Sequence, residues 1–368
     1  MTMFIEQSAA AQTAYAGLAQ AGRQRDLTRS IADLPGGFAR KSVKGRDYLY
    51  HQHRRPDGKL QQIYVGPDDE ETRALIAQHS DMGARQAKKH LADSCEAVMA
   101  LGGYGVIPKH ARVIARLADH GLFRAGGILV GTHAYLAYQN RFGVLWRAAD
   151  TTVDLDFAHP GRNISLALSH DLEIGAQKAI ESLKMGFLPI NEGTRYIKDD
   201  EPDFDLDFLT CLHRRSQEPV TMRCLNLTLQ PLKFMEFSME DPVVAVLPTS
   251  SGPIVVNVPR PERYALAKLV LYMERMEGRN PEKASKDLMQ AASLIDYLSS
   301  RLPDTLQDAW SDLLSRGPSW RKRARQGFEA LTQRHPDIDC AIAWPDSPTR
   351  KQWRESPTPV GRRASDPT

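Results

Sequence analysis

The chain has 368 residues, of which 42% are hydrophobic and 25% charged, and its formal net charge is +3 at pH 7. This composition is typical of a globular protein and excludes collagen-like, low-complexity and strongly charged disordered chains. No apolar run reaches the length of a membrane span, and the near-neutral charge excludes a global field that attracts nucleic acid. The cysteines have no zinc-ligand spacing, which favours reduced thiols in a cytoplasmic protein. They are Cys95, Cys211, Cys224 and Cys340.

The first 121 residues predict an N-terminal region of helices with one β-hairpin. Residues 1–35 predict one or two helices that end at a Pro-Gly-Gly sequence. The first helix is amphipathic, and its apolar positions are Phe4, Ala11, Tyr15 and Leu18. Residues 68–101 predict a long charged helix, because acidic residues at its start favour a helix N-terminus. Residues 108–120 predict a shorter helix.

The hairpin is predicted over residues 41–65, where Tyr48 and Tyr50 alternate before a Pro-Asp-Gly turn. Its cations are interleaved with these tyrosines. They are Lys41, Lys44, Arg46, Arg54, Arg55 and Lys59. Basic residues with aromatics bind a nucleic-acid strand by charge and stacking. The alternative is a small solubilised sheet that packs on the rest of the protein.

A glycine turn follows the first strongly apolar segment. Residues 128–130 predict a short buried strand, Gly131 and Thr132 a tight turn, and a helix is expected to begin near His133. Residues 141–152 do not sustain a helical pattern and predict a loop. A Gly-Thr turn before a helix is usually a cap, but N–H groups at a helix N-terminus also bind phosphate.

The next strand carries two carboxylates. Side chains two residues apart on a strand share a face, so Asp154 and Asp156 are expected to lie side by side while Leu155 and Phe157 face a core. Two adjacent carboxylates repel each other, and a divalent cation between them reverses the sign of that interaction. A lone Asp-X-Asp on a strand is often an exposed edge. The strand, turn, helix and acidic strand in this order indicate a metal-dependent phosphoryl or nucleotidyl transfer site.

A third carboxylate is expected from the sequence PDFDLDFLT. Asp203, Asp205 and Asp207 alternate there with apolar residues, which predicts one acidic and one apolar face. Two Mg²⁺ (or Mn²⁺) ions about 3.5–4 Å apart need about three carboxylates from adjacent strands. Asp154, Asp156 and one of the latter two aspartates meet that need. Asp207 is preferred because the following Phe-Leu-Thr places it on the longest apolar run.

This arrangement resembles the polymerase-beta-like nucleotidyltransferase superfamily, and it is most similar to the bacterial branch of toxin-like and abortive-infection members. The resemblance covers residues 126–210, and the C-terminal half of that branch carries a nucleotide-contacting lysine, which matches Lys268 in PRPERYALAKLVL. The matching motif residues are Gly131 and Thr132, then Asp154 and Asp156, then Asp207.

The resemblance implies a catalytic domain over residues 122–260 and a helical C-terminal domain over residues 261–344. It implies that three carboxylates, Asp154, Asp156 and Asp207, bind Mg²⁺ or Mn²⁺. It implies that Gly131, Thr132 and Lys268 bind the phosphates of an NTP such as ATP, and that an NMP moves to a hydroxyl acceptor with release of pyrophosphate. A cognate antitoxin-like partner is implied by the same branch.

The remaining elements predict the fold class. Residues 164–185 predict a helix, and residues 194–198 and 203–209 predict neighbouring antiparallel strands. Residues 243–247 and 254–258 predict a further strand pair around a Ser-Ser-Gly-Pro turn. A mixed sheet with helices mainly on one side belongs to the α/β (α+β) class.

The C-terminal part predicts helices, the first of which begins at Pro261. Residues 279–298 predict a second helix with Asn280 as its cap. Residues 304–314 and 320–333 predict two more. The tail over residues 345–368 is rich in Pro, Ser and Arg and is expected to be disordered.

Some charged residues have two interpretations. Lys268 is either a surface lysine or a phosphate contact, and Asp287 is placed to orient it. Arg195 faces either the site or the surface. Two basic clusters are either solvated surface or contacts for RNA or triphosphate. They are Arg214 with Arg215, and Arg321, Lys322, Arg323 and Arg325.

The acceptor is left open by the sequence. RNA (including a tRNA 3′ end), a protein hydroxyl and a small molecule such as an antibiotic all suit the site, and the basic segments favour a macromolecule. The alternative from another class is a non-catalytic module that uses the nucleotidyltransferase fold to bind RNA or protein. A glycosyltransferase with Asp-X-Asp and Mn²⁺ explains neither the Gly-Thr turn nor the third acid.

Overall fold

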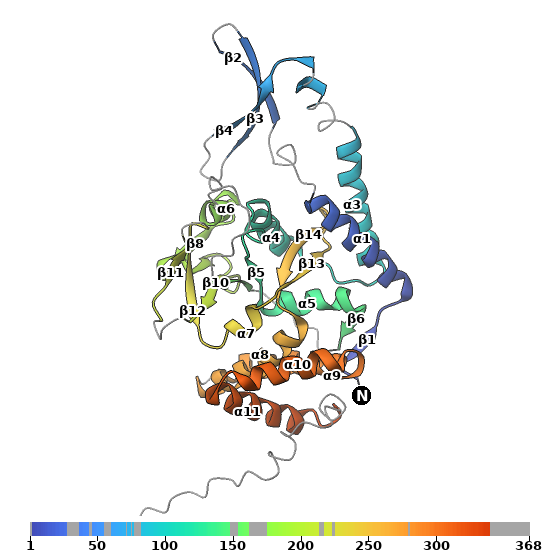
Figure 1. Cartoon of the computed structure of the whole chain (residues 1–368), viewed down its shortest axis with the longest axis vertical. Helices are drawn as coiled ribbons and strands as arrows, with labels where there is room; N and C mark the ends of the chain where they lie inside the picture. Colours follow the sequence, from blue (N-terminus) through green and yellow to red (C-terminus); the bar gives the residue numbers. More distant parts are fainter. Residues whose placement is uncertain are drawn as a thin grey trace, which may run out of the picture.

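The computed structural model in Figure 1 places a central sheet between a small N-terminal sheet and a layer of C-terminal helices. The predicted tail, the Arg214–Arg215 pair, Cys224 and Cys340 lie outside the described residues. The structure describes residues 2–27, 37–43, 46–54, 60–70, 72–74, 76, 82–147, 154–161, 175–212, 217–222, 225–278 and 280–338.

The central sheet is mixed. Its strands are β5 (Ile128–Leu129), β7 (Leu155–His159), β8 (Phe187–Ile190), β9 (Arg195–Lys198), β10 (Leu206–Cys211), β11 (Val220–Met222) and β12 (Leu227–Leu232). The order is β11-β12-β10-β7-β5, and β9 pairs with both β10 and β8. β10 runs parallel to β7 and β12, whereas β5, β9 and β11 are antiparallel to their neighbours. The predicted antiparallel pairing of the strands near residues 194–198 and 203–209 is therefore confirmed.

One face of β7 and β10 is apolar, as the alternation predicts. Leu155 and Phe157 of β7 and Leu206 and Phe208 of β10 are all buried. The two phenylalanine rings stack with centroids 5.5 Å apart. Burying each such side chain contributes roughly 1.5–3 kcal/mol, which pins the strand register and sends the intervening aspartates to the other face.

Three helices flank this sheet, namely α4 (Pro108–Asp119), α5 (Gly131–Phe142) and α6 (Ala176–Ser182). β5 leads directly into α5, whose N-cap is Val130, and α5 packs against β7. α4 matches the short helix predicted over residues 108–120. α6 lies within the helix predicted over residues 164–185, and residues 164–174 of that prediction lie outside the described residues.

The structure near the N-terminus differs from two predictions. Phe4 belongs to a strand, β1 (Phe4–Glu6), and not to the first helix, which is α1 (Ala9–Leu27). β1 pairs antiparallel with β6 (Val144–Trp146), so residues 141–152 are not simply a loop. The two strands lie about 140 residues apart in sequence, and their hydrogen bonds exist only when the chain has folded, so no local pattern signals them.

The helix predicted over residues 68–101 is helical over most of the residues that the structure describes there. Asp69 precedes helical backbone that includes residues 72–74, and its carboxylate accepts a hydrogen bond from the Thr72 N–H at 2.8 Å. The later helix is α3 (Met82–Ala100). The acids therefore lie at the start of helical backbone, as predicted, and residues 77–81 of the predicted helix lie outside the described residues.

The strand pair predicted near residues 243–258 is confirmed as β13 (Val243–Leu247) and β14 (Ile254–Val258). It forms a separate two-stranded sheet. α1 packs against this sheet and against α3, and the Tyr15 hydroxyl donates to the Val246 carbonyl at 3.1 Å.

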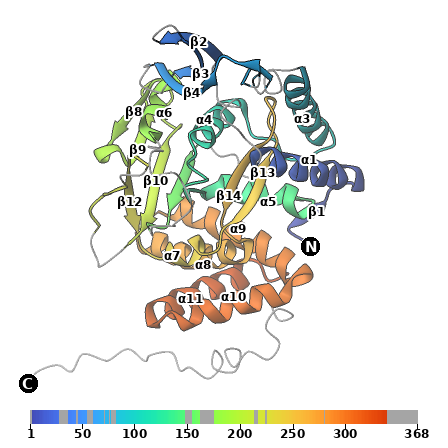
Figure 2. The ribbon, with the colours of Figure 1, turned by 45° about the horizontal axis from the view of Figure 1, so that its top comes forward.

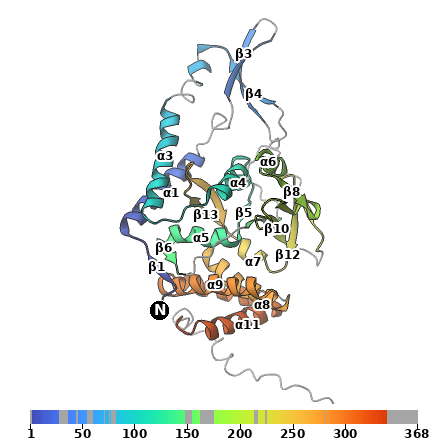
Figure 3. The ribbon, with the colours of Figure 1, turned by 180° about the vertical axis from the view of Figure 1, so that it is seen from behind.

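A three-stranded antiparallel sheet confirms the predicted hairpin and adds one strand to it. Its strands are β2 (Gly37–Val43), β3 (Arg46–Arg54) and β4 (Leu60–Pro67). Figures 1 and 3 show that this sheet projects beyond the central sheet, at the end of the molecule opposite the C-terminal helices.

The C-terminal helices form a layer at the other end, seen in orange and red in Figure 2. They are preceded by the short α7 (Glu236–Met239) and comprise α8 (Pro261–Glu277), α9 (Pro281–Arg301), α10 (Pro303–Ser315) and α11 (Pro318–Arg334). Each of the four has proline in its first turn, where its missing N–H costs nothing. The predicted cap of α9 is confirmed, because the Asn280 side chain accepts from the Lys283 N–H at 3.3 Å.

A mixed sheet flanked by helices confirms the α+β class. The predicted domain boundaries stay a prediction. Among the described helices, none combines the length and the apolar composition that crossing a bilayer requires.

Candidate active site

Four carboxylates stand in two rows on neighbouring parallel strands. Asp156 of β7 lies opposite Asp207 of β10 in the strand register. Asp154 and Asp205 precede them by two residues each, and the Leu155 N–H donates to the Asp205 carbonyl at 2.9 Å. Since side chains alternate along a strand, all four carboxylates belong to the face opposite the buried phenylalanines.

Arg195 distinguishes the two carboxylates of β10. It lies opposite Asp207 in the β9–β10 register, yet its guanidinium donates a hydrogen bond to Asp205. Its Nε atom is 3.7 Å from the nearer oxygen of Asp207. The Asp205 side chain is 8% exposed and that of Asp207 is 29% exposed. Asp205 is therefore neutralised within the protein, whereas Asp207 keeps an accessible carboxylate beside Asp156.

The three remaining carboxylates, Asp154, Asp156 and Asp207, are close enough to repel one another. Burial and, to a smaller extent, the neighbouring Asp156 raise the pKa of Asp207 to about 6, although Arg195 opposes the rise. Burial also raises the pKa of Asp156, although the Lys268 ammonium lowers it. Burial raises the pKa of Asp154 in the same way. This set of carboxylates is costly for folding by itself, and a bound cation relieves that cost.

Gly131 places a helix N-terminus directly against these carboxylates. It has a positive φ of 61°, and a Cβ added there would collide with the Asp156 carboxylate. Glycine alone therefore permits both the left-handed backbone and the close approach. The first N–H groups of α5 have no partner within the helix and carry the positive end of its dipole, which suits an anion beside Asp156.

Thr132 is held from the other side by the C-terminal helices. Its side chain is buried, and its hydroxyl lies 3.3 Å from the Gln290 amide of α9. The same amide contacts the Tyr264 hydroxyl of α8 at 2.8 Å, and that hydroxyl donates to the Gly131 carbonyl at 2.9 Å. Burial raises the pKa of Tyr264 well above its usual value, so the hydroxyl keeps its proton. The Thr132 hydroxyl thus fixes the turn, and the backbone N–H groups are left for a ligand.

Lys268 forms an ion pair with Asp287, the acid that the sequence analysis placed near it. Its ammonium lies 2.6 Å from one oxygen of Asp287, and Arg275 lies 2.5 Å from the other. The Lys268 ammonium also lies over the Tyr264 ring, 5.1 Å from its centroid. Asp287 is fully buried and carries one charge against two cations, so the cluster presents net positive charge toward the carboxylates.

A pocket of about 470 Å³ lies between Gly131, Asp156 and Lys268. Its size lies within the usual range of roughly 300–1,000 Å³ for small-molecule sites. It is bounded by the β5–α5 turn, β7, β10, β12, α7 and α8. Its lining includes Val130, Gly131, Asp156, Leu209, Gln217, Gln230, Met235, Ser238, Tyr264, Lys268, Glu274, Arg275 and Asn280. Acidic, basic and apolar surfaces thus meet in one cavity that suits a charged ligand with a flat apolar part.

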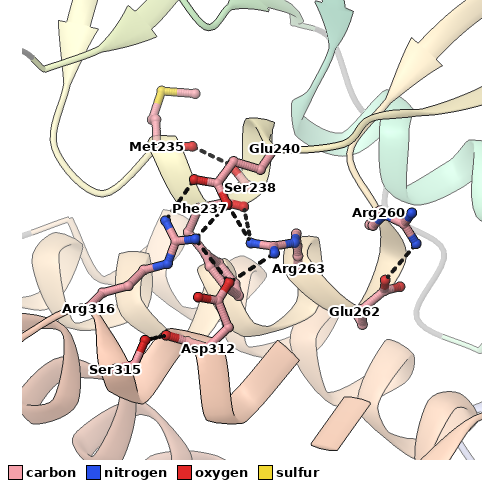
Figure 4. A network of polar contacts seen from close by, with 10 residues as sticks. All are labelled: Met235, Phe237, Ser238, Glu240, Arg260, Glu262, Arg263, Asp312, Ser315 and Arg316. Atoms are coloured by element: carbon pink, nitrogen blue, oxygen red, sulfur yellow. Dashed lines mark hydrogen bonds and ion pairs between the residues drawn. The ribbon is translucent and has the colours of Figure 1, made fainter. Parts of the chain in front are cut away.

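One wall of the pocket is anchored by the ion network in Figure 4. Glu240, which follows α7, lies 3.1 Å from Arg263 of α8 and 2.5 Å from Arg316 at the end of α10. Asp312 lies 2.9 Å from both guanidinium groups. The two arginines also lie over the Phe237 ring, 4.8 and 5.0 Å from its centroid. This network fixes α7, and with it the pocket wall, to the C-terminal helices.

Two residues of α9 contribute to the site although the sequence did not predict them. Gln290 holds the Gly-Thr turn, and Lys283 lowers the pKa of Asp154, Asp156 and Asp207. A signal for Lys283 does exist, because it lies in the first turn of α9, where the helix dipole disfavours a cation. Gln290 carries no such signal, since an amide on a buried helix face has no special sequence context.

The donor set fits a divalent cation. Among the described residues, no group of three or more His, Cys, Asp and Glu side chains already has metal-binding geometry. Asp154, Asp156 and Asp207 nonetheless supply ionised oxygen donors, which suit Mg²⁺ and Mn²⁺ rather than softer metals. Burial is the main cause of their raised pKa values, and the nearby cations offset it only in part.

Comparison with known proteins gives one match. Residues 108–315 match the protein family described as nucleotidyltransferase. The matched segment is more than half of the chain and contains the glycine turn, the carboxylates and Lys268. The curated proteins and the solved structures that were compared contain no match to the chain.

Proposed function

The chain belongs to the nucleotidyltransferase family, and we propose that it transfers an NMP from an NTP, such as ATP, to a hydroxyl acceptor with release of pyrophosphate. One observation carries the proposal. The carboxylates of Asp156 and Asp207 lie opposite each other on parallel strands, and the N-terminus of α5 and Lys268 border the same pocket as Asp156. The place of the chain in the polymerase-beta-like superfamily and its toxin-like branch, with an antitoxin-like partner, is part of the same proposal.

The binding of the nucleotide follows from the charges. The N–H groups of Gly131 and Thr132 bind the β- and γ-phosphates, because a helix N-terminus favours an anion. Lys268 and Arg275 add positive charge from the opposite wall. Asp154, Asp156 and Asp207 would hold Mg²⁺ or Mn²⁺, which when bound neutralises the triphosphate and orients it for in-line displacement.

The residues of the chain then support one transfer step. The acceptor oxygen forms a bond to the α-phosphorus, the bond between that phosphorus and the bridging oxygen breaks, and pyrophosphate leaves with the bonding electrons. Asp207 accepts the proton of the acceptor hydroxyl, which suits a carboxylate whose pKa is raised to about 6. Lys268 stabilises the charge that develops on the leaving group.

The test is transfer of label from each α-³²P-NTP to total RNA and to lysate protein, with Mg²⁺ or Mn²⁺. Asp156→Asn is the inactive variant, and Asp203→Asn is the matched control because Asp203 is exposed on the same acidic run. Label on one RNA or protein band, lost in Asp156→Asn and retained in Asp203→Asn, supports the proposal. NTP binding without release of pyrophosphate under any condition overturns it in favour of a binding module. Release of pyrophosphate with label on neither macromolecule supports a small-molecule acceptor.

A further inference from the structure

The three-stranded sheet β2–β4 has two chemically different faces. Directly opposed residues of an antiparallel pair point to the same side. Tyr48 lies opposite Lys41, and Tyr50 lies opposite Ala39. The intervening residues of β3 point to the other side, where His51 lies opposite Phe38. We refer to the side with Tyr48 and Tyr50 as the tyrosine face.

On the side opposite the tyrosine face, one histidine is buried and the acidic side chains are paired. His51 is 1% exposed, and its ring lies 5.2 Å from that of Phe38. Asp47, the one acidic residue in the three strand sequences, accepts hydrogen bonds from Arg40 and Ser42. Asp68, just after β4, lies 2.8 Å from Arg40. The acidic charge of this sheet is therefore paired with arginine, away from the tyrosines.

In the described strands β2–β4, the tyrosine face carries cations and no acidic residue. Lys41 and Arg46 are exposed, and both follow the side-chain alternation that includes Tyr48 and Tyr50. The Lys41 ammonium lies 5.9 Å from the centroid of the Tyr50 ring. The whole chain has a net charge of only +3, so this positive surface is a local feature rather than a consequence of composition.

The spacing of the tyrosines favours an unstacked strand. Two residues along a β-strand span about 7 Å, which is about twice the 3.4 Å rise of stacked bases in a duplex. Successive bases therefore reach both rings only if the strand is extended and its bases are unstacked. Sheet faces that combine aromatic rings with cations bind single strands in this way, because bases stack on the rings and phosphates meet the cations.

We propose that the tyrosine face binds single-stranded RNA and so recruits the acceptor of the transfer reaction. The binding itself stands on the sheet alone, and its assignment to the acceptor rests on the proposed function. The proposal gives a role to the basic residues of the predicted hairpin. The sheet projects from the rest of the molecule, which leaves room beside it for a long polymer (Figure 1).

The test measures binding of a fluorescein-labelled, single-stranded RNA of about 12 nucleotides by anisotropy. Tyr48→Ala and Tyr50→Ala are each expected to weaken binding by about 5-fold to 100-fold, since stacking on one ring is lost. Tyr48→Phe and Tyr50→Phe keep the rings and are expected to stay within about 2-fold of the wild type. Lys41→Gln with Arg46→Gln is expected to reduce the slope of log K against log salt by about 1.4.

The matched control removes two charges at the far end of the molecule. Arg321 and Lys322 are exposed on α11, so Arg321→Gln with Lys322→Gln is expected to leave binding unchanged. An equal loss in this control, or unchanged binding in both Tyr→Ala variants, overturns the proposal. So does equal affinity for a duplex of the same sequence, or preferential capture of an unstructured polypeptide such as casein. Thermal unfolding and the Tyr→Phe variants separate loss of binding from loss of folding.

Two results separate this inference from the proposed function. RNA bound equally by the wild type and Asp156→Asn, without any transfer of label, supports the RNA face while the proposed function fails. Label transferred to RNA equally by the wild type and the double Tyr48→Ala, Tyr50→Ala variant supports the function and overturns the recruitment of the acceptor by the tyrosine face.

Discussion

Replacing Asp207 by Asn is expected to stabilise the protein while it abolishes transfer. In the folded protein, burial and the neighbouring Asp156 raise the pKa of Asp207 from 3.8 to about 6. At about 1.4 kcal/mol per pKa unit, ionisation of this group costs the folded state about 3 kcal/mol. The variant loses the contact at 3.7 Å with Arg195, a half-exposed pair worth about 0–1 kcal/mol. A net gain of about 2–3 kcal/mol is expected.

The pH dependence has a definite sign. Because the pKa of Asp207 is higher in the folded state, its ionisation destabilises the protein above about pH 6, and that penalty vanishes below 3.8. The melting temperature of Asp207→Asn is therefore expected to exceed that of the wild type by roughly 2–10 °C at about pH 7.5 and to match it near pH 4. Added Mg²⁺ is expected to raise the melting temperature of the wild type but not of the variant.

Two neighbouring aspartates supply the controls. Asp203 is exposed, so Asp203→Asn is expected to change stability by less than about 0.5 kcal/mol. Asp205 is paired with Arg195, so Asp205→Asn is expected to destabilise the protein by about 1–3 kcal/mol. A lower melting temperature for Asp207→Asn at neutral pH, or a difference that does not change with pH, refutes the assignment of charge repulsion to this site.

Further variants test the turn at Gly131 and the role of Lys268. Gly131→Ala is expected to lose transfer activity and about 1–3 kcal/mol of stability, because the new Cβ collides with Asp156 and φ is positive. Gly17→Ala on α1, where a Cβ meets nothing within 4 Å, is expected to stabilise by about 0.5–1 kcal/mol, and thermal melts compare the two. Lys268→Gln is expected to lower kcat/KM for the NTP by roughly 10²–10³, whereas Lys88→Gln on the exposed face of α3 is expected to leave it unchanged. Equal kinetics for the two lysine variants contradict a phosphate role for Lys268.

Elements with a local sequence pattern were predicted correctly before their tertiary contacts were known. Alternation of acidic and apolar residues predicted the faces of β7 and β10, and Leu155 and Phe157 are buried as expected. The Asn280 cap and the proline at the start of α9 were also predicted correctly. Such features follow from side-chain periodicity and capping, which act over a few residues and need no partner from elsewhere in the chain.

The contacts between side chains of distant elements became known only from the folded structure. The sequence preferred Asp207 over Asp205 as the third carboxylate but did not reveal that Arg195 pairs with Asp205, which leaves Asp207 the more exposed of the two. The pairing of β1 with β6, and the contact of Gln290 with the glycine turn, had no sequence signal. Periodicity tells which face of its own element a side chain occupies. It does not tell which distant element packs on that face, and the charge balance of the site is set by that packing.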